Sequence, residues 1–397
     1  MKEGWTNKTL GEVCKIYNGN SINADYKKKH FLGATGGLPF IATKDVSSLG
    51  TLDYNNGVRI PNYEEYKIAP ANSVFICAEG GSAGKKFAYV EKEVCFGNKL
   101  FCITPKDKSL TGKFVYHFVQ SDNFRGQFFS LLTGLIGGVS AKKFQSIEIP
   151  VPPLSEQQRI VDYLDSAFAK IDAMKANAEK ALNEAKAFFQ ASLKEMLEPK
   201  EGWEEKKLKD LGQTQTGTTP SKSDKANYGD YMEFIRPSEI DYDGNGGIDY
   251  NSEMKLSKQG ASNGRIFASN SIFMVCIGAT IGKVGFSTKK VSCNQQINVF
   301  TPKDEIKYKF AYYAMKSPLF QHRVIKEGSS SQATLPIINK GKWENLSISF
   351  PETKEQELIV SHLDNLSSKI TELKTNFEKI SQECDALKQA ILRQVFE

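Results

Sequence analysis

Two long segments of this chain, residues 155–197 and 354–396, carry the same pattern of apolar residues. In the second segment the apolar residues are separated alternately by four and three positions over five heptads, with polar or charged residues at most other positions. Neither segment contains glycine or proline, so each is predicted to form one uninterrupted helix, about 60 Å long at about 1.5 Å per residue. A seven-residue repeat of this length is typical of a coiled coil.

The two helices are predicted to pack against each other along one seam. In the first helix the seam is predicted at Ile160, Leu164, Ala167, Ile171, Met174, Ala178, Ala181, Ala185, Phe188, Ser192 and Met196. In the second helix, 199 residues later, it is predicted at Ile359, Leu363, Leu366, Ile370, Leu373, Phe377, Ile380, Cys384, Leu387, Ile391 and Val395. The alanines of the first helix correspond to larger residues of the second, and small residues facing large ones fill an interface at native density.

The regions outside the seam repeat as well, which argues against two unrelated core helices. Glu156-Gln157, near the start of the first helix, recurs as Glu355-Gln356 in the second. Before the helices the offset is 198 residues: Glu3-Gly4-Trp5 recurs as Glu201-Gly202-Trp203, and Gly80-x-x-x-Gly84-Lys85 recurs as Gly278-x-x-x-Gly282-Lys283. The chain is therefore an internal duplication in which each copy is a block followed by a helix.

The duplication divides the chain into four parts. Residues 1–152 and 200–350 are the two blocks, and residues 153–199 and 351–397 are the two spacer helices. Runs of β-branched and aromatic residues at 74–77 and 272–276 predict buried strands, so the fold class is predicted to be α+β. Because the chain begins with the Glu-Gly-Trp that also follows the first helix, the four parts are predicted to close a pseudo-twofold circular arrangement. In that arrangement the two helices are antiparallel and the chain ends are close together.

Charge is distributed unevenly over these parts. Residues 1–152 carry 19 Lys and Arg against 13 Asp and Glu, and residues 201–350 carry 20 against 16, whereas both helical parts have more acidic than basic residues. This favours two blocks that bind a polyanion, joined by near-neutral spacers. No apolar run approaches the ~20 residues of a membrane span, and the start of the chain is not a signal peptide. Seven scattered cysteines without close pairs are typical of reduced thiols in a cytoplasmic protein.

Several catalytic interpretations fail on the spacing or setting of their residues. Gly80-x-x-x-Gly84-Lys85 is one residue short of a nucleotide phosphate loop and is not followed by Ser or Thr. Glu253-x-Lys255 behind Asp241 and Asp243 imitates a nuclease metal site, but the acids lie in a Gly-Asn loop that is typical of a turn. The chain has no Asn-Pro-Pro-aromatic or Asp-Pro-Pro-Tyr run of an amino-methyltransferase, no Ser-His-Asp or Cys-His arrangement and no metal-ligand cluster. It is predicted to be non-catalytic.

Features of the blocks and of their exits carry a family resemblance. Each block opens with Gly-Trp and contains a strand followed by Gly-x-x-x-Gly-Lys. The first block ends in Ile149-Pro-Val-Pro-Pro-Leu-Ser-Glu-Gln-Gln-Arg-Ile160; the second, Phe350-Pro-Glu-Thr-Lys-Glu-Gln356, keeps Glu355-Gln356 but lacks the double proline. With this duplication, essentially the whole chain resembles the specificity subunit of type I restriction-modification systems.

The resemblance implies that each block is a target recognition domain that reads one half of a bipartite, asymmetric DNA target. The spacer helices are then expected to set the gap between the halves and to dock two modification subunits, so that the chain directs adenine methylation and restriction. S-adenosylmethionine is expected on the modification subunits, and ATP and Mg on the restriction (motor-nuclease) subunits. The chain itself is expected to bind no cofactor. Its expected partners are double-stranded DNA and these subunits, with no membrane.

The candidate DNA-binding residues lie in polar loops at equivalent places in the two blocks. Lys85 and Lys283 are assigned to phosphate contacts, because backbone N–H groups of a glycine turn and a nearby ammonium suit an anion. The amides of Asn98, Gln295 and Gln296 suit adenine edges. The full set is Ser82, Lys85, Lys86, Asn98, Lys99, Lys142, Lys143, Thr218, Ser221, Lys222, Thr280, Lys283, Gln295, Gln296, Ser330, Ser331 and Gln332. The alternative for each lysine is a solvated turn residue, and for each amide a side chain satisfied within its loop.

Two other functions are compatible with these patterns. The first is a coiled-coil scaffold or adaptor that does not bind DNA, which a steep salt dependence of binding to duplex DNA would oppose. The second is a nucleic-acid enzyme with an unrecognised site, which methyl transfer or cleavage by the purified chain alone would support.

Overall fold

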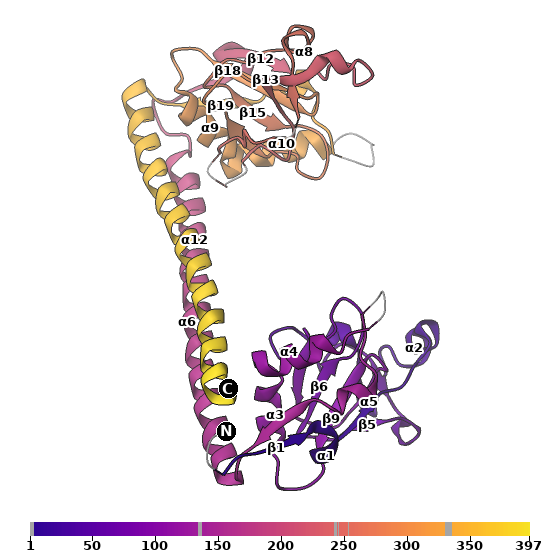
Figure 1. Cartoon of the computed structure of the whole chain (residues 1–397). Coiled ribbons are helices and arrows are strands. Elements are labelled where there is room, and N and C mark those ends of the chain that lie inside the picture. The colour runs from indigo at the N-terminus through magenta and orange to yellow at the C-terminus, as the bar shows by residue number, and fades with distance from the viewer. Residues whose placement is uncertain (1–3, 134–136, 242–243, 245, 253, 330–335) are drawn as a thin grey trace. The chain divides into compact units, whose positions relative to one another are not determined.

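The computed structural model describes residues 4–133, 137–241, 244, 246–252, 254–329 and 336–397 (Figure 1). The chain divides into two compact units: unit 1 contains Met1–Ala176 with Lys379–Glu397, and unit 2 contains Asn177–Glu378. The boundary between them crosses both long helices, α6 (Leu154–Met196) and α12 (Thr353–Phe396), so each unit holds one block and part of each helix. The predicted α+β fold class and the two long helices are confirmed.

The block of unit 1 is built on two four-stranded sheets. The first, in the order β2-β9-β6-β7, contains β2 (Cys14–Asn18), β6 (Ser73–Cys77), β7 (Phe87–Val90) and β9 (Leu100–Pro105). The second, in the order β4-β3-β8-β5, contains β3 (Leu38–Ile41), β4 (Arg59–Ile60), β5 (Ile68–Ala69) and β8 (Val94–Phe96). Strand β1 (Thr6–Thr9) pairs with β10 (Glu148–Val151), so the chain enters the block beside its exit. The short helices are α1 (Leu10–Val13), α2 (Ala24–His30), α3 (Gly112–Phe118), α4 (Asp122–Ser130) and α5 (Ala141–Phe144).

The block of unit 2 repeats this plan. Its four-stranded sheet, in the order β12-β18-β15-β16, contains β12 (Gly212–Thr216), β15 (Ile272–Val275), β16 (Val284–Phe286) and β18 (Ile297–Pro302). Its second sheet, in the order β14-β13-β17, contains β13 (Tyr228–Ile235), β14 (Lys255–Leu256) and β17 (Ser292–Cys293), and β11 (Glu204–Lys207) pairs with β19 (Ser347–Phe350). The short helices are α7 (Leu208–Leu211), α8 (Lys258–Asn263), α9 (Tyr308–Lys316), α10 (Pro318–Ser329) and α11 (Lys340–Trp343).

The central strand β6 is buried on both faces, as its unbroken apolar run predicts. Because side chains of a strand point alternately to opposite faces, Val74 and Ile76 join the core that includes Phe114 of α3. Phe75 joins the core that includes Phe96 of the second sheet. The corresponding strand β15 of unit 2 divides its residues between two cores in the same way, so the two blocks share one packing plan.

Within unit 1 the two long helices run antiparallel. Lys175 of α6 pairs with Asp385 of α12 at 3.4 Å, and Lys388 of α12 pairs with Asp172 of α6 at 2.6 Å, so the numbering rises along one helix as it falls along the other. The start of the described chain and its C-terminus also meet in this unit, because Trp5 lines the same 320 Å³ pocket as Phe396 and Glu397.

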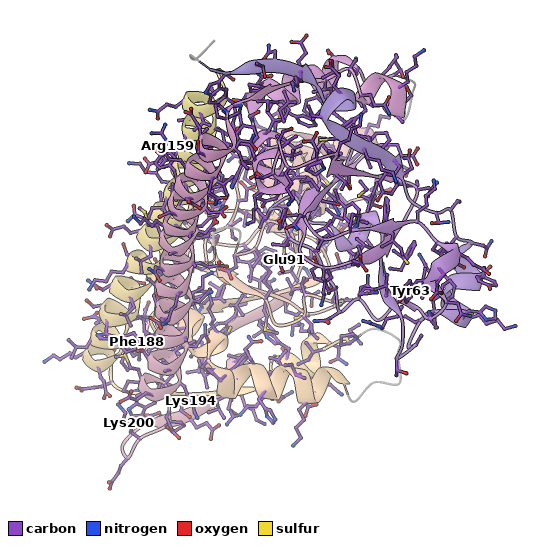
Figure 2. The ribbon with its side chains drawn as sticks, turned by 90° about the horizontal axis from the view of Figure 1, so that it is seen from below. Tyr63, Glu91, Arg159, Phe188, Lys194 and Lys200 are labelled. Atoms are coloured by element: carbon purple, nitrogen blue, oxygen red, sulfur yellow. The ribbon has the colours of Figure 1, made fainter. Side chains whose placement is uncertain are left out.

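The buried face of α6 departs from the predicted seam at three of its eleven positions. Leu164 and Ile171 are buried as predicted, but Met174 is 59% exposed and Ala181 is exposed. Phe188, which Figure 2 labels, is 61% exposed. After Ala181 and Phe188 the next residues, Leu182 and Phe189, are buried, and Phe168 is buried beside the half-buried Ala167. In α12 the predicted Leu387 is 48% exposed. Burying Phe168 and Leu182 in place of alanines removes more apolar area from water.

In the repeated Glu-Gln pair near the start of each long helix, the glutamine is buried and links the block to the helix. Gln157 is fully buried, its Oε1 accepts the Thr111 N–H at 3.0 Å, and its Nε2 donates to the carbonyls of Ser109 at 2.7 Å and Pro152 at 2.9 Å. Gln356 makes the same three bonds, to Lys307 N–H and to the carbonyls of Glu305 and Pro351. Each block is therefore fastened to its helix by one amide whose two N–H groups are both used.

None of the helices in the described part of the chain has the length and apolar character needed to cross a membrane.

Candidate nucleic-acid interface

In unit 1, the loops that carry the predicted residues meet at one edge of the four-stranded sheet. Because neighbouring strands are antiparallel, the ends of β2 and β6 lie beside the starts of β7 and β9. The loops are joined by backbone hydrogen bonds from Ala78 N–H to Lys99 O at 2.8 Å and from Asn98 N–H to Asn20 O at 3.1 Å. We call this edge the loop edge of unit 1.

Unit 2 forms an equivalent loop edge from the ends of β12 and β15 and the starts of β16 and β18. Cys276 donates its N–H to Gln296 O at 2.8 Å, as Ala78 does to Lys99 in unit 1. Gly278 donates to Pro336 O at 3.1 Å, as Gly80 does to Gly137 at 2.8 Å. The loops of both edges are thus held by corresponding bonds.

The Gly-x-x-x-Gly-Lys segments form tight turns at these edges. Gly80 and Gly84 have φ of +80° and +69°, and Gly278 and Gly282 have φ of +97° and +87°, a region that side chains other than glycine rarely adopt. Within the turns, Lys85 N–H donates to Ser82 O at 3.0 Å and Lys283 N–H donates to Thr280 O at 3.1 Å. Each turn leads into a strand, β7 or β16, and not into a helix, so it lacks the helix N-terminus of a nucleotide phosphate loop.

The loops after β2 and β12 each contain a glycine, Gly19 or Gly217, that lies close to the backbone of the turn before β9 or β18. A Cβ on Gly19 would lie 2.0 Å from Phe96 O, and one on Gly217 would lie 2.1 Å from Asn294 O. Only glycine fits where two backbones come this close. This explains why the two glycines recur in the duplicated sequence.

The candidate amide side chains differ in their exposure and in the hydrogen bonds that they form within their own loops. Asn98 is exposed, and its side chain makes no hydrogen bond with any described residue. Gln295 is exposed and its Oε1 accepts from Thr219 Oγ1. Gln296 is half-buried, and its Oε1 accepts from Asn294 Nδ2 at 3.0 Å. Asn98 and Gln295 therefore present the more accessible amides of the set.

The predicted lysines of unit 1 fall into two groups. Lys142 and Lys143 lie on α5, just after Val139, whose N–H donates to Ala78 O of the loop edge at 3.1 Å. Lys85, Lys142 and Lys143 are exposed, with side chains that make no hydrogen bond or ion pair to the described residues. Lys86 Nζ instead donates to Thr43 O at 3.0 Å, and Lys99 Nζ lies 3.6 Å from Glu79 Oε1. The first group has ammonium groups free for phosphate, whereas the second is already partnered.

The loop after β12 brings Thr218, Ser221 and Lys222 to the loop edge of unit 2. Thr218 donates its backbone N–H to Cys293 O at 2.9 Å, and its Oγ1 is buried without a hydrogen bond to the described residues. Ser221 and Lys222 are exposed, with Ser221 Oγ 2.8 Å from Ser223 Oγ. Thr280 is exposed and Lys283 half-buried. The candidates Ser330, Ser331 and Gln332 lie outside the described residues.

Three polar residues at the loop edges were not among the candidates. Asn18 Nδ2 donates to Asn98 O at 2.8 Å, Asn20 Oδ1 accepts Lys67 N–H at 2.7 Å, and Thr219 contacts Gln295. The Asn-Gly-Asn run around Gly19 is a turn signal in the sequence that could have identified the first two. Thr219 has no comparable signal, because its partner is 76 residues away.

Among the described residues, the cysteines and the possible metal ligands form no recognisable catalytic or metal centre. Burial raises the pKa of Cys14 and Cys276 to about 12 and that of Cys95 to about 11, so these thiols are protonated at neutral pH. Over the ranges that the structure describes, no three His, Cys, Asp or Glu side chains are placed to hold a metal ion. Asp243 and Glu253 of the nuclease interpretation lie outside those ranges.

A comparison with known protein families gives two matches along the chain, in agreement with its internal duplication. A family model described as "Type I restriction modification DNA specificity domain" matches residues 2–184 and again residues 200–382. Each match contains one block together with much of the helix that follows it.

Individual relatives match over different lengths. The chain is 30% identical to the EcoKI specificity subunit of Escherichia coli (strain K12), over 49% of this chain but only 42% of that protein. It is 24% identical to the Escherichia coli EcoBI specificity subunit, over 100% of this chain and 86% of that protein. A solved structure titled "Structural basis underlying complex assembly and conformational transition of the type I R-M system" matches 100% of this chain and 98% of its own, with a TM-score of 0.76 and 19% identity. At this identity the structural likeness concerns the fold.

Proposed function

Because the chain belongs to the family of type I restriction-modification DNA specificity domains, we propose that it is the DNA-reading subunit of such a system. Each block binds duplex DNA through its loop edge and reads one half of a bipartite, asymmetric target. The observation that carries this proposal is the duplication of the loop edge. Glycine turn, lysine and exposed amide occur at the same end of the same sheet in both units.

The chemistry of the loop edges suits two kinds of DNA contact. Exposed lysines such as Lys85, Lys142 and Lys143 contact phosphates, which supply affinity without sequence information. The accessible amides of Asn98 and Gln295 contact base edges, where an amide pairs well with adenine. The blocks diverge in the loops between the repeated motifs, so their two half-sites are expected to differ.

We further propose that the chain performs no catalytic step and acts through partners. The long helices set the gap between the half-sites and dock two modification subunits that carry S-adenosylmethionine and methylate adenine. Restriction subunits with ATP and Mg join for cleavage, in the cytoplasm. The helices expose apolar side chains suited to protein contacts: Tyr163 is 50% exposed and Leu358 is 72% exposed.

An exchange of blocks tests the division of labour. The block at residues 1–152 is replaced by that of another family member, and adenine methylation is mapped across the genome of cells that carry either version with its modification subunits. One half of the methylated sequence is expected to change while the other half and the gap stay the same. A change in both halves, or in neither, would refute the assignment of one half-site to each block.

Direct binding separates this function from a scaffold that does not bind DNA. The full chain, with its modification subunits, is titrated with duplex DNA at several salt concentrations. A polyanion contact predicts that log K falls linearly with log salt, by about 0.9 for each phosphate neutralised. A flat or absent response would favour the scaffold.

A further inference from the structure

The two units differ in the charges that face each other between their long helices. In unit 1 two ion pairs cross the interface: Lys175 with Asp385, and Lys388 with Asp172. The helices are duplicated with an offset of 199 residues, so each of these four positions has a counterpart in unit 2. The residues at these counterpart positions show whether unit 2 can form the same two ion pairs.

Both carboxylates are missing from the corresponding positions of unit 2. Thr371 stands where Asp172 would be and Lys186 where Asp385 would be, while Lys374 is retained in the place of Lys175. Phe189 occupies the position that corresponds to Lys388, the lysine of the second ion pair. Lys186 and Lys374 therefore occupy the places of an ion pair but carry the same charge. Both lysines are exposed, and neither forms an ion pair or hydrogen bond within the described part of the chain.

These two lysines line a pocket together with a third lysine, Lys316. The pocket has a volume of 440 Å³ and is lined by Lys186, Lys374 and Lys316, together with Asp241 and Gln190 among others. Lys316 is only 21% exposed; its Nζ lies 3.5 Å from Asp241 Oδ2 and donates to Tyr312 OH at 2.8 Å and to Gly244 O at 3.2 Å. Lys316 is thus already partnered within the pocket, and the exposed Lys186 and Lys374 supply the ammonium groups that are available to a ligand.

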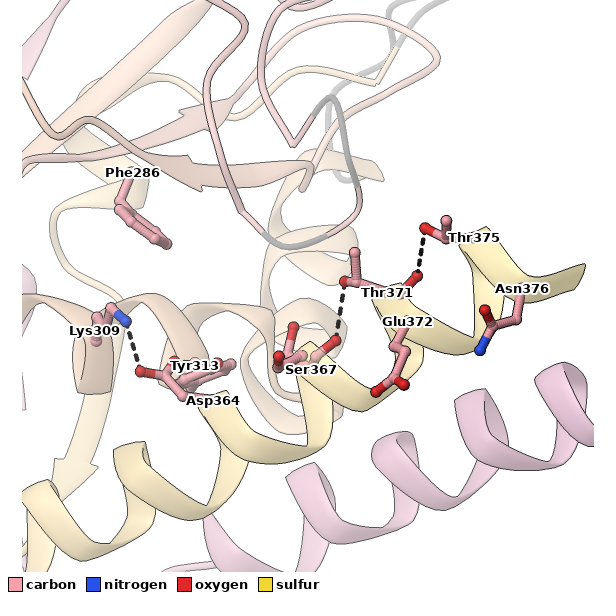
Figure 3. A pocket seen from close by; sticks show the side chains of 10 residues that line it. Phe286, Lys309, Tyr313, Asp364, Ser367, Thr371, Glu372, Thr375 and Asn376 are labelled. Atoms are coloured by element: carbon pink, nitrogen blue, oxygen red, sulfur yellow. Dashed lines mark hydrogen bonds and ion pairs between the residues drawn. The ribbon is translucent and has the colours of Figure 1, made fainter. Parts of the chain in front are cut away.

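The neighbouring surface adds hydroxyl groups to the same side of α12. A second pocket of 620 Å³, shown in Figure 3, shares Ser367 and Thr371 with the first. Thr371 Oγ1 donates to Ser367 O at 3.1 Å. Like charges held close together repel one another unless an anion lies between them. An oxyanion has several acceptor oxygens, so it can receive bonds from several ammonium groups at once.

We propose that the pocket of Lys186, Lys316 and Lys374 binds a small multivalent oxyanion of the phosphate class. The bound anion takes the place of the two carboxylates that unit 1 supplies from its own helices. It thereby stabilises the pairing of α6 with α12 in unit 2. This site is separate from the loop edges and does not rest on the proposed reading of DNA.

Rebuilding the ion pair tests the proposal. Unfolding of the full chain by urea is followed with increasing inorganic phosphate, while sodium chloride keeps the ionic strength constant. The midpoint of the wild-type chain is expected to rise with phosphate concentration, since a ligand that binds only the folded state stabilises it by mass action. Lys186→Asp places a carboxylate opposite Lys374, so it is expected to raise the midpoint without phosphate and to abolish the response to phosphate.

Matched variants make the outcome decisive. Lys369→Asp changes charge equally on the exposed surface of α12 outside the pocket, and it is expected to keep the wild-type phosphate response. Lys374→Met, a second pocket variant, is expected to bind phosphate at least tenfold more weakly in isothermal titration. A wild-type midpoint that ignores phosphate, or a response that survives in both pocket variants, would overturn the proposal. Duplex DNA binding distinguishes the source of the anion: an unchanged salt slope in Lys374→Met supports free phosphate, and a slope lower by about 1 would indicate a DNA phosphate and overturn the proposed small oxyanion.

Discussion

His117 Nε2 lies 2.8 Å from Asp165 Oδ1, which joins helix α3 of the first block to the long helix α6. Unit 2 makes the same link with a different donor, because Tyr313 OH donates to Asp364 Oδ1 at 2.7 Å. In both units a lysine adds a second contact to the carboxylate: Lys113 reaches Asp165 at 3.3 Å, and Lys309 reaches Asp364 at 2.5 Å. The link between block and helix is thus retained although one of its residues has changed type.

Acid is expected to weaken the link in unit 1. The hydrogen bond from His117, together with the charge of Lys113, holds the pKa of Asp165 below its usual value of 3.8. A carboxyl whose pKa is lowered by folding stabilises the folded state above its unfolded pKa, and this contribution is lost as the pH falls through the folded value. The gap in urea midpoint between the wild type and Asp165→Asn should therefore shrink as the pH falls below about 4. A gap that stays constant at low pH would contradict this.

The size of the hydrogen-bond donor at position 117 is expected to be complementary to that of its neighbour on α6, Phe168. The His117 ring packs against Phe168 at a centroid distance of 5.7 Å, whereas the equivalent of Phe168 in unit 2 is Ser367, beside the pocket that Tyr313 lines. His117→Tyr alone should overpack this site and destabilise unit 1 by about 1–3 kcal/mol. Adding Phe168→Ser should recover part of that loss. Urea unfolding of both single variants and the double variant measures the coupling, and simple additivity would argue against it.

The buried glutamines are expected to be equally important in the two units. Gln157→Ala or Gln356→Ala removes three hydrogen bonds and leaves buried backbone groups unsatisfied, so each should cost about 2–4 kcal/mol in the free energy of unfolding. The exposed neighbour Gln158 is the control, and its change to alanine should cost less than about 0.5 kcal/mol. A cost as small for Gln157→Ala would show that the amide does not hold block and helix together.

Two lysines of α5 are expected to contact DNA phosphates. Replacing both Lys142 and Lys143 with glutamine should lower the slope of log K against log salt by about 2, with little change in the preferred sequence. Lys108, which is exposed beyond the opposite end of β9, is the control. Its change to glutamine should leave the slope unaltered.

The exposed amides are expected to affect one half-site each. Asn98→Ala should cost about 1–3 kcal/mol of discrimination at a base in one half of the target, and Gln295→Ala should do the same in the other half. Binding to a library of duplex sequences measures both. If either variant relaxed both halves together, the amide would be acting on the shape of the whole complex and not on its own half-site.

The duplication and the element types were predictable from the sequence alone. The repeats of Glu-Gly-Trp and Glu-Gln revealed two copies, and the apolar run of β6 and the long seven-residue patterns indicated strand and helix. These features depend on local spacing, which secondary structure imposes directly on the chain. The loops of the candidate interface also follow from local glycine and amide signals.

The tertiary structure decided which side chains those elements bury and which they oppose. It buried Leu182 and left the predicted Ala181 exposed on α6, since burial depends on what the partner helix and the block present. It also determined the role of Gln157, whose partner Thr111 is 46 residues away, and it placed Lys186 and Lys374 on the same pocket. Spacing along one helix cannot reveal such pairings, because they join residues that are brought together only when the chain folds.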